Sequence, residues 1–95
     1  MKKTVIKSGA KLLKALGNDK RLEIVSLLLD GEKSVNELVE VVGVSQSSLS
    51  QHLAVLRKEK ILKTRRVSQT IYYSINCDKT MQILDIMGIL DKNFS

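Results

Sequence analysis

One short stretch, residues 45 to 52, carries most of the hydrogen-bonding side chains that could do chemistry in this chain. It supplies Ser45, Gln46, Ser47, Ser48, Ser50, Gln51 and His52. Hydroxyls and carboxamides both donate and accept hydrogen bonds, which suits them to the base edges in a DNA major groove. We favour Gln46, Ser48 and Gln51 for base readout. A serine here could equally contact a phosphate or water, and His52 is better explained by phosphate contact or packing than by metal binding.

A basic segment overlaps and follows this stretch. The whole chain has a net charge of +6. Residues 44–76 contain six Lys or Arg against Glu59 alone, whereas the rest of the chain is nearly balanced in charge. Clustered cations beside a hydrogen-bonding helix favour a phosphate-binding surface; the alternative is a solvated charge cluster. We expect backbone and wing contacts from a set of polar residues, namely Lys58, Lys63, Arg65, Arg66, Ser68 and Gln69.

Catalysis has little support in the sequence. The chain has one histidine and one cysteine, its acids are scattered, and no glycine-rich phosphate loop is present. We therefore expect no enzyme, no cofactor and no metal site. The cysteine, Cys77, cannot form a disulfide within the chain. Near a helix start its pKa could be depressed, making it a redox thiol, or it could be a half-buried structural thiol.

The polar stretch needs two helices to position it. Ser34 and Glu37 form a capping-box pattern that predicts a helix start. That helix would bury Leu38, Val41 and Val42; Gly43 suits a left-handed turn, and Val44 packs into the corner. Ser45 would cap the second helix, whose apolar face is Leu49, Leu53 and Leu56. The spacing predicts a helix-turn-helix over residues 34–56, for which a bare helical hairpin is the alternative.

Further elements are expected on both sides of this motif. The pattern predicts a helix over 3–16 with a weak apolar stripe, and another that Asn18 caps, running to Asp30 before Gly31. Residues 62–67 and 70–75 are β-prone, with a hairpin tip over 67–70. Asn76 or Asp78 would cap a last helix, 78–91, whose apolar stripe is Ile83, Ile86, Met87 and Leu90.

Length and composition agree with one small domain. Ninety-five residues form one modest core, which must be aliphatic because aromatic residues are 3% of the chain. The apolar runs are far shorter than the roughly 20 residues of a membrane span, and no secretory signal is apparent. We expect a cytoplasmic protein that does not associate with a membrane.

The order helix, helix, helix-turn-helix, hairpin, helix is that of a winged helix: a mainly α fold with a small β-hairpin. The chain resembles the ArsR/SmtB family of bacterial repressors in LKALGNDKRLEIVSLL, in VGVSQSSLSQHLAVLRKEKIL and in the closing YYSI. The resemblance implies a single DNA-binding domain over 1–95 with its wing at 62–75. It also implies a homodimer formed through helices 3–16 and 78–91, a palindromic duplex-DNA operator, and an unknown small-molecule or redox inducer. The alternative is a winged helix for protein assembly or RNA binding.

Several departures from the family pattern concern its switches and turns. Val39 and Val41 stand where metal-sensing members have cysteines, and Asp85 is followed by Met87 rather than by histidine. Lys60 replaces a usual glycine, so a positive φ there would cost roughly 1 kcal/mol. The wing tip, VSQT, also lacks the expected glycine.

Overall fold

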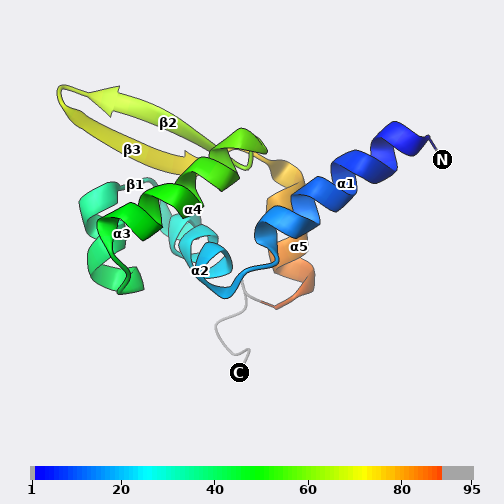
Figure 1. Cartoon of the computed structure of the whole chain (residues 1–95), viewed down its shortest axis with the longest axis horizontal. Coiled ribbons are helices and arrows are strands. Elements are labelled where there is room, and N and C mark those ends of the chain that lie inside the picture. Colours follow the sequence, from blue (N-terminus) through cyan, green and yellow to red (C-terminus); the bar gives the residue numbers. More distant parts are fainter. Residues whose placement is uncertain (1, 89–95) are drawn as a thin grey trace.

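The computed structural model describes residues 2–88 of the chain. The elements are α1 (Lys3–Leu16), α2 (Asp19–Leu27), the 3-10 turn η1 (Leu28–Asp30), β1 (Lys33–Ser34), α3 (Val35–Val42), α4 (Gln46–Lys58), β2 (Leu62–Val67), β3 (Thr70–Ile75) and α5 (Asp78–Ile86). The β2–β3 hairpin projects from the helical body, and the N-terminal half of α1 extends away from it (Figure 1). This arrangement confirms the predicted mainly α winged helix.

The core is aliphatic, as the composition indicates. Its buried apolar residues come from α1, α2, η1, α3, α4, α5 and the start of the wing: Ala15, Leu16, Ile24, Val25, Leu28, Leu38, Val42, Leu49, Leu53, Leu56, Ile61, Leu62 and Leu84. Tyr73 and Ile75 of β3 pack on its edge. Burial of these side chains fixes α4 against the rest of the body, because the hydrophobic gain is proportional to the apolar area removed from water.

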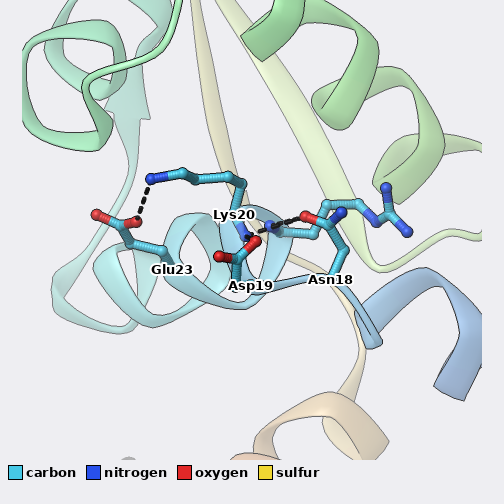
Figure 2. Close-up of polar contacts among 5 residues, drawn as sticks. Asn18, Asp19, Lys20 and Glu23 are labelled. Carbon is cyan, nitrogen blue, oxygen red and sulfur yellow. Dashed lines mark hydrogen bonds and ion pairs between the residues drawn. The ribbon is translucent and has the colours of Figure 1, made fainter.

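The predicted cap of the second helix is confirmed. The Asn18 side chain accepts hydrogen bonds from the backbone N–H groups of Lys20 (3.0 Å) and Arg21 (3.1 Å), as Figure 2 shows beside the Lys20–Glu23 ion pair. The α-helix ends at Leu27, however, and the last predicted turn is the 3-10 turn η1. Gly31 then takes a φ of 131°, a backbone conformation that favours glycine.

The sheet has a strand that the sequence did not predict. The two residues of β1 pair with β3, Lys33 opposite Tyr73 and Ser34 opposite Tyr72, giving the antiparallel order β1-β3-β2. Two polar residues carry no alternating pattern, so periodicity cannot detect such a strand. The wing is therefore anchored to the segment that leads into α3 and is more than an isolated hairpin.

Two local predictions were wrong. Val41 is 57% exposed, because Leu38 and Val42 already form the buried face of the short α3 helix. Neither Asn76 nor Asp78 caps α5: Cys77 is the N-cap residue, without a side-chain cap bond. The Asn76 backbone instead donates to the Ile61 carbonyl at 2.8 Å, which ties the end of β3 to the start of β2.

The terminal helices leave apolar side chains uncovered. On α1 Ile6 is 55% and Leu13 59% exposed, and Ile86 at the end of α5 is 85% exposed. Residues 89–91 of the expected last helix, including Leu90, lie outside the described residues. Within residues 2–88, no helix has the length and apolar character to cross a membrane.

Candidate nucleic-acid interface

The junction of α3 and α4 has the geometry that its sequence predicts. The Ser34 backbone N–H donates to the Glu37 carboxylate at 3.1 Å, and the Glu37 N–H donates to Ser34 Oγ at 3.3 Å. The Ser34 backbone N–H and then the Ser34 hydroxyl lower the pKa of the Glu37 carboxylate, aided by the charge of Lys33 and opposed by desolvation. Gly43 ends α3 with a φ of 73°, so the chain turns sharply into α4, as a helix-turn-helix requires.

The second helix presents a polar face to solvent. Ser45 Oγ accepts a hydrogen bond from the Ser48 N–H at 3.1 Å, which confirms the predicted cap. Gln46, Ser47, Ser50 and Gln51 are exposed along α4, while Ser48 is half-buried. Because Leu49, Leu53 and Leu56 hold the opposite face in the core, the exposed face is presented on a rigid support.

His52 lies apart from this polar face. It is half-buried, and its Nδ1 lies 3.4 Å from Nη1 of Arg21. Arg21 also donates through Nε to the Ala15 carbonyl and through Nη2 to the Lys14 carbonyl. His52 thus links α4 to the junction of α1 and α2. The sequence singled out His52 but gave no indication of its partner, which is 31 positions away.

The wing carries two neighbouring arginines in different surroundings. Arg65 forms an ion pair with Glu32, with Nε donating to Oε2 at 3.1 Å, and its guanidinium lies 5.4 Å from the Tyr72 ring centroid. The hydrogen bond to Arg65, aided by its charge and opposed by desolvation, lowers the pKa of Glu32. The same bond raises the pKa of Arg65. Arg66 is exposed, and strand alternation places it on the opposite face of the hairpin.

The remaining predicted contacts lie around this wing. Lys58 is exposed at the end of α4, Lys63 is exposed on β2, and Ser68 and Gln69 are exposed at the hairpin tip. Ser68 takes a φ of 57°, which allows the tip to turn without the glycine that the sequence lacks. Lys60, between α4 and β2, takes a positive φ of 61° at the position where the family usually has glycine.

Cys77 is half-buried at the start of α5, apart from the polar face of α4. Burial raises the pKa of its thiol, but the nearby Thr80 hydroxyl, the Thr80 and Lys79 backbone N–H groups and the Lys79 charge together lower the pKa below its usual 9.0, although none of them forms a hydrogen bond of normal geometry with the sulfur. The Thr80 hydroxyl is completely buried and has no partner of normal geometry in the described part of the chain. A thiolate at Cys77 is the acceptor that would satisfy this hydroxyl. In residues 2–88, no three His, Cys, Asp or Glu side chains come together to hold a metal ion.

A capped helix with an exposed polar face, followed by a basic two-stranded wing, defines a winged helix-turn-helix domain of the class that binds duplex DNA. Residues 18–64 match the model of the bacterial regulatory protein, arsR family. The chain belongs to the ArsR family, as the sequence motifs indicated.

Three relatives illustrate the range of this family. The chain is 42% identical to the transcriptional activator HlyU of Vibrio cholerae over 76 aligned residues. The alignment covers 80% of this chain and 70% of HlyU. The solved HlyU structure has a TM-score of 0.86 at 38% identity, over 96% of this chain and 98% of that one. The transcriptional repressor BigR of Xylella fastidiosa has a TM-score of 0.81 at 34% identity, covering 99% and 100% of the two chains.

The third relative is described as the homodimeric winged helix-turn-helix DNA-binding domain Mb0332 of Mycobacterium bovis. It has a TM-score of 0.83 at 25% identity, over 92% of this chain and 81% of that one. The relatives are transcriptional regulators rather than enzymes. The chain is therefore a DNA-binding transcriptional regulator with a winged helix-turn-helix fold.

Proposed function

We propose that the chain acts as a homodimeric repressor that reads a palindromic operator with one α4 helix in each of two major grooves. The exposed row of Gln46, Ser47, Ser50 and Gln51 on a core-anchored helix is the observation that carries this proposal. In a symmetric dimer the two half-sites would lie about one helical turn apart.

The dimer would form through α1 and α5. Val5, Ile6 and Leu13 on α1, with Met81, Ile86 and Met87 of the α5 region, are exposed apolar residues that a second copy can cover. The homodimeric state of Mb0332 supports the same assignment. Ile6→Asp should shift the protein from dimer to monomer in analytical ultracentrifugation. Val41→Asp, at an equally exposed valine outside these helices, should remain dimeric; a dimeric Ile6→Asp protein would contradict the assignment.

Within the interface we assign different roles to different residues. Gln46, Ser47, Ser50 and Gln51 contact base edges, and His52 orients α4 through Arg21. Ser48, which the sequence favoured for base readout, is half-buried and its N–H is bound to Ser45 Oγ, so we assign it together with Ser45 to the helix start. Lys58, Lys63 and Arg66 bind phosphates, with Ser68 and Gln69 at the wing tip close to the backbone. Arg65 contributes less to phosphate binding than Arg66 does, because the charge of Arg65 is already paired with Glu32.

A gel-retardation experiment at physiological salt tests this proposal. The protein should retard its own upstream DNA much more strongly than random duplex, and equal retardation would refute operator recognition. Gln51→Ala should weaken binding to the operator by roughly 1–3 kcal/mol, with little effect on random DNA. Arg66→Ala should weaken both and flatten the salt dependence, so each variant is the control for the other.

Two further experiments address regulation. Because this dimer would occupy its own promoter region, deleting the gene should raise expression of a reporter fused to the upstream promoter; a fall would identify an activator. We propose that oxidation of the Cys77 thiol is the inducing signal that weakens DNA binding. Peroxide should weaken DNA binding by the wild type but not by Cys77→Ser, and equal behaviour of the two proteins would remove the redox proposal and leave a small-molecule inducer.

A further inference from the structure

A second basic surface lies on one flank of α4, where α1 and α2 pack beside the C-terminal end of that helix. It is a groove of about 400 Å³ lined by Lys11, Lys14, Ala15, Arg21, Val55, Lys58 and Glu59; we call it the α1–α4 groove. Four of these seven residues are cations, contributed by three different helices, and Glu59 is the single carboxylate among them. Such convergence of positive charge lowers the free energy of a bound anion.

Arg21 gives the groove one fixed cation. Its guanidinium is half-buried and held by the Ala15 and Lys14 carbonyls and by His52 Nδ1. Those contacts use three of its five N–H groups, and the other two have no acceptor among residues 2–88. Because Arg21 also occupies carbonyls at the C-terminal end of α1, it offsets the negative end of that helix, which would otherwise repel an anion.

The three lysines complete the groove from its rim. Lys11 and Lys14 are exposed on adjacent turns of α1, and Lys58 is exposed at the end of α4. Ala15 and Val55 supply apolar walls, against which lysine stems can lie with their ammonium groups free. The lysine spacing on α1 is visible in the sequence, but its position opposite Lys58 depends on how α1 packs.

The groove and the wing lie on different flanks of α4. Ser50, Ala54 and Arg57 line the cleft between α4 and Tyr73 of the wing, whereas Val55 and Glu59 line the α1–α4 groove. Lys58, at the end of α4, lines both. Figure 1 shows α4 between the β2–β3 hairpin and α1. A helix in a major groove has a phosphate strand on each side, about 12 Å apart.

We propose that the α1–α4 groove is a phosphate-binding site. Two sources can supply the phosphate: the DNA backbone on the side of α4 away from the wing, or a free phosphorylated molecule. The DNA source rests on the proposed docking of α4 in the major groove, whereas the free source does not. In either case Arg21 and the three lysines are the ligands, and an anion in the groove would connect α1 to the recognition helix.

The test compares two double variants that remove the same charge. Lys11→Gln with Lys14→Gln removes two cations of the groove. Lys3→Gln with Lys79→Gln removes two exposed cations outside it; Lys3 lies roughly 12 Å from Lys11 along α1. Circular dichroism and ultracentrifugation of all proteins should first show an unchanged fold and assembly.

In the first arm, binding to a random duplex is measured by fluorescence anisotropy between 50 and 200 mM NaCl. Losing two phosphate contacts should reduce the salt slope by about 2, so the wild-type affinity falls roughly tenfold more than that of the groove variant over this range. The control variant should keep the wild-type slope. In the second arm, inorganic triphosphate is titrated calorimetrically without DNA and should bind the wild type and control but not the groove variant.

The outcomes separate the sources and the proposals. If the salt slope of DNA binding changes only in the groove variant, the phosphate belongs to DNA. If triphosphate binds the wild type and the control variant but not the groove variant, the phosphate belongs to a free molecule. If neither arm distinguishes the groove variant from the control, the phosphate site is wrong. Loss of operator preference would refute the proposed function without affecting either arm, because both omit the operator.

Discussion

Replacing Lys60 with glycine should stabilise the protein. Lys60 has a φ of 61° and lies just after the end of α4, where its N–H donates to the Arg57 carbonyl at 2.9 Å. The next N–H, of Ile61, reaches back to the Leu56 carbonyl at 2.9 Å, and both side chains are completely buried. This pair of bonds is the Schellman motif, which needs a left-handed residue and usually takes glycine.

The size of the effect follows from two opposing contributions. A side chain in the left-handed region costs roughly 1–2 kcal/mol, and glycine removes this cost. Glycine also has more conformational freedom in the unfolded chain, and this lowers the free energy of unfolding by roughly 0.5–1 kcal/mol. The net gain should be about 0.5–1 kcal/mol. For a domain of this size that corresponds to a rise in Tm of roughly 2–8 °C.

Thermal and urea unfolding, followed by circular dichroism at one fixed protein concentration, measure this gain. Fixed concentration matters because the stability of an associating protein depends on it. Lys60→Ala is the matched control, since it loses the same charge but keeps the Cβ atom, and it should not gain stability. If Lys60→Gly is no more stable than Lys60→Ala, backbone strain at this position is refuted. If Lys60 also binds phosphate, both variants should show a salt slope for DNA that is smaller by about 1.

Two other polar contacts give predictions of their own. Because its lowered pKa lies below the usual 4.5, Glu32 stabilises the fold through Arg65 above pH 4.5, and this contribution is lost as the pH falls through the lowered value. Glu32→Gln should therefore lose less stability than wild type between pH 7 and pH 3.5 in urea unfolding, and should bind random DNA with a steeper salt slope, since Arg65 is released; equal pH profiles would contradict the pairing. Alkylation of Cys77 by iodoacetamide should show a midpoint below pH 9.0, and Thr80→Val, which removes the buried hydroxyl, should raise that midpoint without destabilising the fold. An unchanged midpoint would show that Thr80 does not stabilise the thiolate.

The sequence predicted those features that neighbouring residues determine. The capping box of Ser34 and Glu37, the Gly43 turn and the Ser45 cap each involve atoms within about one helical turn, so their residue types are sufficient to identify them. Lys60 is different: the family resemblance, in which glycine is usual at this position, drew attention to its backbone, and only the structure shows that its φ is positive. The exposed side of α4 followed from the spacing of its buried leucines.

Caps, turns and apolar spacing cannot predict contacts between segments that are distant in the sequence. Arg65 and Glu32 are 33 positions apart, so nothing in the local pattern shows that one wing arginine is paired and the other is not. The strand β1 exists because Lys33 and Ser34 lie beside β3. Val41 is exposed because none of the elements within residues 2–88 covers that side of α3.

The sequence by itself thus determined the helix-turn-helix, the wing and the family, because capping, periodicity and turn geometry depend on residues close together in the chain. Only the tertiary structure brought Lys11, Lys14, Arg21 and Lys58 to one groove and attached His52 to the end of α1. Those juxtapositions depend on how the helices pack, and packing is decided by the combined burial of many aliphatic side chains rather than by any one motif.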